Sequence, residues 1–210
     1  LSGNVNQRYQ QADGFPVITN WQDPIRYQCQ TNVILGIGDT NTWQDKNLPG
    51  PTNGTGEPGK PPEVLADDTV NVVDNLRDIR LMEGDSAAAA LTRATANTYS
   101  HANNSAYMAA LAYDAHTRDI RPPGPRELPG KQTISTHWVD VVEFGGFKNT
   151  NTNQFWLTAK YGGFRVPPDY DPDTMTTPLP NAMWWGTGDL VNGNAAFPRA
   201  DNFYIASDAK

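Results

Sequence analysis

The sequence predicts a three-layer α/β fold, in which helices flank a mostly parallel sheet and long irregular loops connect the elements. Three short runs, at residues 33–37, 134–142 and 203–206, are apolar and rich in β-branched or aromatic residues, as strands are. The segments between these runs carry apolar residues at helical spacing. Strands that alternate with helices pair in parallel through right-handed crossovers, which predicts that the three strands are neighbours.

The composition favours a single domain, residues 1–210, that is part of a longer protein. The chain has 210 residues, of which 38% are hydrophobic, and it begins without Met. Its 18 Gly and 17 Pro predict long irregular segments, which we place at residues 1–28, 49–62 and 166–200. The net charge of -7 argues against a nucleic acid or an anionic membrane as a partner. No stretch approaches the roughly 20 apolar residues that a membrane span needs.

The first apolar run, at residues 33–37, predicts a strand that is buried on both faces of a parallel sheet, because the run is nearly continuous rather than alternating. Asp39 is the first charged residue after this run. Open α/β sheets bind their ligands beyond the carboxyl ends of the strands, so Asp39 is a candidate functional residue. The alternative is that Asp39 only caps a turn, which is a common role for Asp.

Three helices are expected between the first and second strands. Residues 68–81 carry apolar side chains at helical spacing, and a second helix through residues 87–91 follows a cap at Asp85 or Ser86. A third helix starts within residues 103–105 and must end before the next Pro-Pro pair.

One further helix is expected between the second and third strands. Thr152 or Asn153 caps its start, and Gly162-Gly163 ends it. With this helix, the element order strand, helices, strand, helix, strand is complete.

The sequence contains no motif that indicates an enzyme. His101, His116 and His137 are the only histidines, and no two of them have the spacing of a zinc site. Neither a nucleophile elbow nor a phosphate-binding loop occurs. The single cysteine, Cys29, precedes a strand rather than a helix, which gives little support for a reactive thiol. We therefore expect neither a catalytic residue nor a cofactor-binding residue in this chain.

Asp169, Asp171 and Asp173 alternate along the chain as carboxylates do in a calcium-binding loop. An EF-hand loop also needs Gly at its sixth position and Glu at its twelfth, where this chain has Thr174 and Pro180. A solvated acidic loop is the favoured interpretation, and a metal site made by these three residues is the alternative.

Five segments in order resemble the later half of a von Willebrand factor A domain, as found in type IV pilus tip adhesins of the PilC/PilY family. They are YQCQTN at 27–32, which precedes VILGIGD, then YMAALAYDAHTRDIR at 107–121, GKQTIST at 130–136, AKYGGF at 159–164 and DNFYIAS at 201–207. The resemblance implies a Rossmann-like sheet of the von Willebrand factor A type.

The resemblance also implies a non-enzymatic function in surface adhesion, pilus assembly and twitching motility. The protein would pass through the periplasm and the outer membrane to the pilus tip at the cell surface. Its partners would be minor pilins and an unknown ligand on a host or abiotic surface. The alternative is a structural tip scaffold that primes pilus assembly through minor pilins and binds no external ligand.

By the same resemblance, Asp39 aligns with an aspartate that coordinates a metal ion. The D-x-S-x-S motif that completes this site in the family does not occur in the chain. We therefore expect no cofactor in this chain alone, and Mg²⁺ or Ca²⁺ in the intact protein. The candidate recognition residues are Trp43, Trp184 and Trp185, because they lie in expected loops and Trp is favoured at interfaces.

Overall fold

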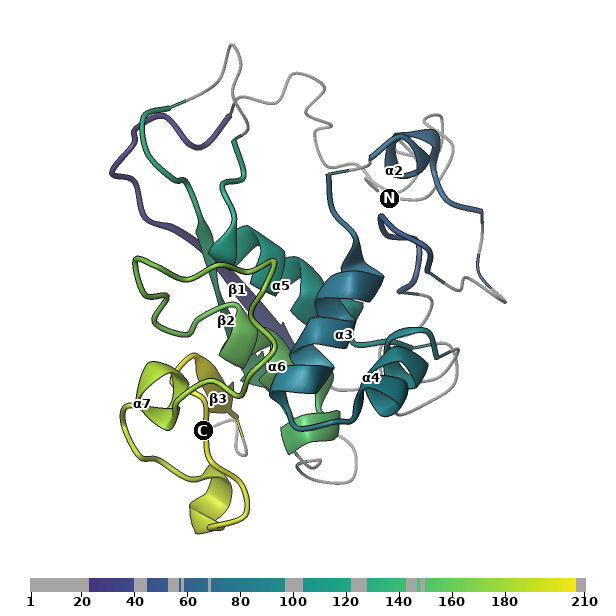
Figure 1. The fold of residues 1–210 in the computed structure, drawn as a ribbon. Helices are drawn as coiled ribbons and strands as arrows, with labels where there is room; N and C mark the ends of the chain where they lie inside the picture. The colour runs from purple at the N-terminus through teal and green to yellow at the C-terminus, as the bar shows by residue number, and fades with distance from the viewer. Residues whose placement is uncertain are drawn as a thin grey trace, which may run out of the picture.

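The sheet consists of three parallel strands, β1 (Asn32–Gly38), β2 (Ile134–Asp140) and β3 (Phe203–Ile205), in the order β1-β2-β3 (Figure 1). The strands and their parallel pairing are confirmed, and so is the α/β class. β2 is shorter than expected, because Val142 takes a positive φ of 51° that an extended strand does not allow.

The computed structural model describes residues 23–39, 45–52, 57, 59–67, 69–96, 104–121, 128–142, 147 and 150–206. Within these residues the helices are α2 (Pro62–Leu65), α3 (Val72–Met82), α4 (Ala87–Ala94), α5 (Tyr107–Thr117), α6 (Gln154–Tyr161) and α7 (Asn181–Trp184). Single 3-10 turns occur at Thr150–Thr152 and Val191–Gly193.

Side-chain caps fix the starts of three helices. Asn71 caps α3, Ser86 caps α4 and Asn153 caps α6, each through a side-chain oxygen that accepts backbone N–H groups. Ser86 therefore has the capping role for which Asp85 was the alternative. Asp85 instead pairs with Arg80, at 2.8 Å.

The third helix starts slightly later than expected. α5 begins at Tyr107, and the Ser105 hydroxyl, outside the helix, accepts a hydrogen bond from the Tyr107 N–H at 3.1 Å. Two further short helices were not expected from the sequence. α2 begins at the end of the segment 49–62, and α7 lies within the segment 166–200.

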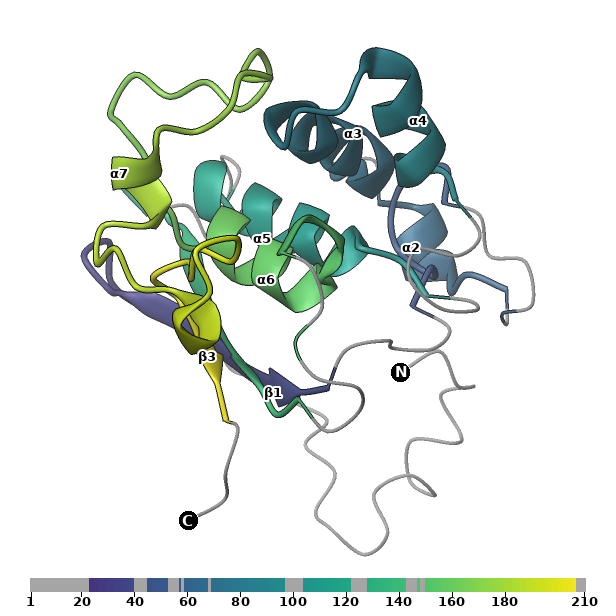
Figure 2. The same ribbon diagram turned by 90° about the horizontal axis from the view of Figure 1, so that it is seen from below.

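The described helices lie on one face of the sheet. Figure 2 shows α5 and α6 over the strands, with α3 and α4 stacked beyond α5 and α6. The Trp138 ring of β2 stacks on Phe155 of α6 with 4.0 Å between ring centroids, which joins the sheet to the helical core. The expected layering, with helices flanking the sheet, is therefore seen on one side of the described part of the chain.

The expectation that the first strand is buried on both faces is wrong for this structure. Val33, Ile34, Leu35 and Ile37 of β1 are between 50% and 66% exposed. In the described part of the chain β1 pairs with β2 alone, and the covering helices α5 and α6 pack mainly over β2. A continuous apolar run thus predicted the strand correctly but not its burial.

Candidate functional site

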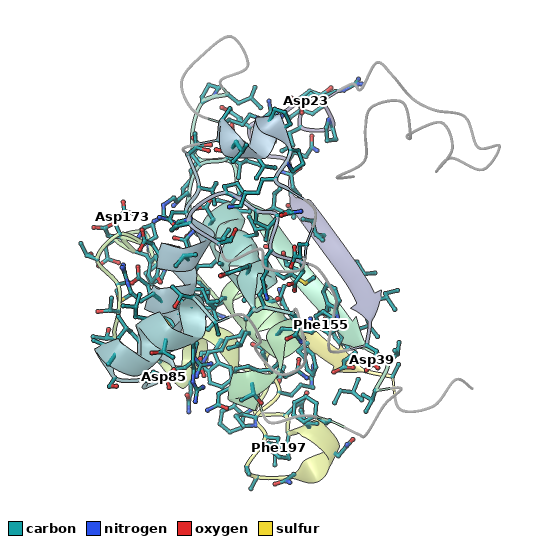
Figure 3. All side chains as sticks on the ribbon, turned by 90° about the vertical axis from the view of Figure 1, so that its right-hand side faces the viewer. Asp23, Asp39, Asp85, Phe155, Asp173 and Phe197 are labelled. Atoms are coloured by element: carbon teal, nitrogen blue, oxygen red, sulfur yellow. The ribbon has the colours of Figure 1, made fainter. Side chains whose placement is uncertain are left out.

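Two carboxylates lie near each other at the carboxyl ends of neighbouring strands. Gly38 pairs with Asp140 in the parallel register, so Asp39 follows β1 beside the last residue of β2. Figure 3 shows Asp39 at the tip of the β1 arrow. Asp39 therefore lies where the sequence places it, past the carboxyl end of the first strand, where open α/β sheets bind ligands.

Asp140 is the buried member of this pair. Its Oδ1 accepts a hydrogen bond from the Val142 N–H at 2.9 Å, and its Oδ2 accepts one from the Asn153 side chain at 3.2 Å. Burial raises the pKa of Asp140, these two hydrogen bonds lower it, and the Asp39 carboxylate raises it further. The net direction is upward, so the effect of burial outweighs that of the two hydrogen bonds.

The backbone beside Asp140 is strained. Val142 has a φ of 51°, which is unfavourable for a β-branched residue and costs on the order of 1–3 kcal/mol. The hydrogen bond from Val142 to Asp140 holds this conformation in place. Strained backbone is concentrated at functional sites, so it adds support for a site at this edge.

Asn153 connects the start of α6 to the same edge. Its Oδ1 accepts hydrogen bonds from the N–H groups of Phe155 and Trp156, both at 2.9 Å, while its side-chain N–H₂ donates to Asp140. One amide therefore caps the helix and satisfies a buried carboxylate. The sequence predicted the cap but not the contact with Asp140. The one available signal was that Asp140 is the single acidic residue within the apolar run at residues 134–142.

The described residues at this edge do not form a complete metal site. Among them, no group of three or more His, Cys, Asp or Glu residues is placed to hold a metal ion. Both carboxylate oxygens of Asp140 accept hydrogen bonds within the protein. Ca²⁺ takes about six to eight oxygen ligands and Mg²⁺ about six. The metal-binding role of Asp39 therefore stays a prediction for the intact protein.

Asp169, Asp171 and Asp173 are exposed. Asp171 accepts hydrogen bonds from the Asp173 N–H and the Thr174 hydroxyl, both at 3.0 Å. Asp173 also forms an ion pair with Arg118. These contacts agree with the interpretation of this segment as an acidic loop.

The candidate recognition tryptophans differ in how far they are buried. Trp184 is only 7% exposed, packs edge-on against Trp156 and donates to the Leu179 carbonyl, so it belongs to the core. Trp185 is partly buried and stacks against Trp184. Trp43 lies outside the described residues. Of the two candidate tryptophans that the structure describes, Trp185 is the one with side-chain surface available for recognition.

A buried ion pair that the sequence did not predict joins α6 to the end of α3. The Lys160 ammonium lies 2.6 Å from a Glu83 carboxylate oxygen, which also accepts the Tyr161 hydroxyl at 2.7 Å. The same ammonium lies 4.0 Å from the centre of the Trp184 ring. Burial lowers the pKa of Lys160, and the Glu83 carboxylate opposes this shift. Since Lys160 is paired and enclosed, we assign this cluster to stability rather than to ligand binding.

Comparison with known proteins shows that the sequence of this chain is similar to part of a pilus protein. The chain is 57% identical over 216 residues to the type IV pilus biogenesis factor PilY1 homolog of Xylella fastidiosa (strain Temecula1). The match covers all of this chain and 17% of that protein. The whole chain is thus similar to one part of a PilY1 homolog.

This match fits the resemblance to the PilC/PilY family. It does not test the finer assignment to the von Willebrand factor A fold. No protein-family model and no solved structure matches the chain. Among the described residues, no helix is long and apolar enough to span a membrane.

Proposed function

We propose that this chain is a non-enzymatic module of a type IV pilus tip protein, which acts in pilus assembly, surface adhesion and twitching motility. One observation carries the proposal: the chain is 57% identical, over its whole length, to part of a pilus biogenesis factor. The proposed location is the pilus tip at the cell surface, reached through the periplasm and outer membrane. The proposed partners are minor pilins and a surface ligand.

The arrangement of the sheet supports a von Willebrand factor A-type domain as the framework of this module. Three parallel strands in sequential order place Asp39 at their carboxyl end, beside the strained turn that follows Asp140. In the intact protein, Asp39 would be one oxygen ligand of Mg²⁺ or Ca²⁺. The further ligands would come from outside the described residues.

The second candidate function is a tip scaffold that primes pilus assembly through minor pilins and binds no external ligand. The name of the relative speaks of biogenesis, which favours this alternative. The burial of Trp184 favours it as well, since it removes one candidate contact residue from the surface.

Substitution of Asp39 in the intact protein separates the two functions. We expect cells that lack the protein to lose surface pili, measured by shearing and immunoblotting. We expect Asp39→Ala to preserve pili but reduce attachment to a surface and the diameter of the twitching zone. Asp169→Ala is the matched control, because Asp169 is an exposed carboxylate away from the sheet edge.

Each result has a defined meaning. If Asp39→Ala removes pili together with attachment, the scaffold function is favoured. If both variants leave pili and attachment unchanged, Asp39 is not part of an adhesive site. Normal piliation in cells without the protein contradicts both functions.

A further inference from the structure

A cavity of about 320 Å³ lies at the amino end of β2, at the opposite edge of the sheet from Asp39. Lys131 and Thr133, which precede or adjoin the start of β2, line it together with His116 from the last turn of α5. The loop that follows α6 supplies the other lining residues, Val166, Pro167, Pro168 and Tyr170. Ligand-binding cavities in proteins hold roughly 300–1,000 Å³, so this one has room for a small group.

The apolar side of the cavity is held in a fixed shape. The rings of Pro167 and Pro168 fix the φ angles of both residues. Tyr170 is only 8% exposed, its hydroxyl lies 2.8 Å from the Tyr113 hydroxyl in a hydrogen bond, and its ring packs edge-on against Phe164. The cavity is therefore preformed, which reduces the conformational entropy that is lost on binding.

His116 joins this loop to β2 and is neutral at pH 7. Its Nε2 lies 2.7 Å from the Phe164 carbonyl oxygen and its Nδ1 lies 3.3 Å from the Ile134 carbonyl oxygen, so both ring nitrogens face the backbone. Burial lowers the pKa of His116, the two hydrogen bonds oppose this shift, and the Lys131 ammonium adds to it. Lys131 is therefore the one lining residue that carries a charge at pH 7.

Lys131 is exposed, and no ion pair in the described part of the chain includes it. Asp119 contacts the next residue, but its Oδ1 accepts the backbone N–H groups of Gln132 and Arg121, at 3.2 and 3.0 Å. The Thr133 hydroxyl has no hydrogen-bond partner among the described residues either. An ammonium and a hydroxyl thus lie beside an apolar wall, and both have hydrogen bonds left to donate.

We propose that this cavity binds a carboxylate group joined to an apolar body, supplied by a polypeptide as its C-terminal residue or as an acidic side chain. The Lys131 ammonium would pair with the carboxylate, and the Thr133 hydroxyl would donate a second hydrogen bond to it. The apolar body would pack against Val166, Pro167 and Pro168. The proposal rests on this cavity and not on the adhesive function.

The lining favours a single carboxylate over other charged ligands. Phosphate sites usually combine several Arg side chains or backbone N–H groups at a helix N-terminus, whereas this lining offers one ammonium. No acidic residue lines the cavity, so it offers no carboxylate to a divalent metal ion. The net charge of the chain, -7, opposes the approach of a polyanion.

Saturation-transfer-difference NMR, which detects weak ligands of a large protein, tests the proposal on the intact protein. N-acetylleucine carries its carboxylate as a chain terminus does, and N-acetylglutamate N-methylamide carries it on a side chain. N-acetylleucinamide is the matched control, because it has the same apolar body without the charge. We expect at least one acid to bind, and the neutral amide to bind about fivefold more weakly than N-acetylleucine, as the loss of one partly exposed ion pair predicts.

Three variants of the intact protein locate the binding. Lys131→Met removes the charge and keeps an apolar side chain, and it should weaken the binding of the acids about fivefold. Lys131→Arg keeps the charge and should preserve binding. Arg93→Gln, on α4, is the control for net charge, because Arg93 is a partly exposed cation outside the cavity lining, and it should preserve binding as well.

The two acids also identify the source of the carboxylate. Tighter binding of N-acetylleucine indicates a chain terminus, tighter binding of N-acetylglutamate N-methylamide indicates an acidic side chain, and equal binding means that the cavity accepts both. Equal binding of N-acetylleucine and its amide contradicts the proposal, and so does unchanged binding in Lys131→Met. If neither acid binds the intact protein, the cavity is not a carboxylate site. None of these measurements depends on piliation or attachment, so they test the cavity separately from the proposed function.

Discussion

Trp184 and Trp185 are adjacent in the sequence, but their surroundings differ. Trp184 is buried against Trp156 and beneath the Lys160 ammonium, whereas Trp185 is partly exposed. We expect Trp184→Ala to lower the free energy of unfolding by about 3–5 kcal/mol, the usual range for emptying a large aromatic core site. Trp185→Ala is the matched control, and it should lower the free energy of unfolding by clearly less. Urea denaturation measures both, and equal losses would contradict the burial of Trp184.

His116 makes stability depend on pH. Burial lowers the pKa of His116, although hydrogen bonds to the Phe164 and Ile134 carbonyls oppose this shift. The unfolded chain binds a proton near the ordinary value of about 6.5, and the folded chain binds it only at lower pH. The contribution of neutral His116 is therefore complete above about pH 6.5 and is lost as the pH falls toward the folded-state pKa.

We expect the free energy of unfolding to fall as the pH decreases from 7 toward 5, and His116→Gln to reduce this slope. Urea denaturation at several pH values measures the slope. His137→Gln is the control, because His137 lies on the side of β2 away from the helices, beside Tyr204. An unchanged slope in His116→Gln would assign the pH dependence to other groups.

At the scale of elements, the junction between β2 and α6 depends on Asn153. Asn153→Ala removes a helix cap, which costs on the order of 0.5–2 kcal/mol, and leaves one oxygen of buried Asp140 without its partner, which adds about 1–3 kcal/mol. Ser86→Ala removes only an exposed cap of α4, so it is the matched control. We expect Asn153→Ala to lower the unfolding midpoint in urea more than Ser86→Ala does. Similar midpoints would mean that the bond to Asp140 contributes little.

At the scale of the whole molecule, the described residues supply only part of a metal site. Among the described residues, no group of three or more His, Cys, Asp or Glu residues is placed to hold a metal ion. One carboxylate without further oxygen ligands binds Mg²⁺ or Ca²⁺ only weakly.

We therefore expect calorimetric titration to detect weak or no binding of Mg²⁺ and Ca²⁺ to the 210-residue chain. The intact protein should bind more tightly, and Asp39→Ala should remove that binding, whereas Asp171→Ala should preserve it. Submicromolar binding by the 210-residue chain would contradict the expectation. Loss of such binding in Asp171→Ala would place the site in the acidic loop instead.

Much of the fold follows from the sequence, because strands and helix starts depend on nearby residues. The apolar runs, the helical spacing in α3 and the caps at Ser86 and Asn153 are local patterns, and the structure confirms them. The position of Asp39 past the first strand is local too, since it depends only on where an apolar run ends.

Burial and side-chain partners were decided by the tertiary structure alone. The apolar run of β1 is exposed because the helices cover β2, and Trp184 is buried because α6 places Trp156 and Lys160 against it. The contact between Asp140 and Asn153 likewise depends on how α6 docks on the sheet. Local spacing determines which segments can be strands or helices, but exposure depends on the residues, distant in sequence, that pack against each side chain.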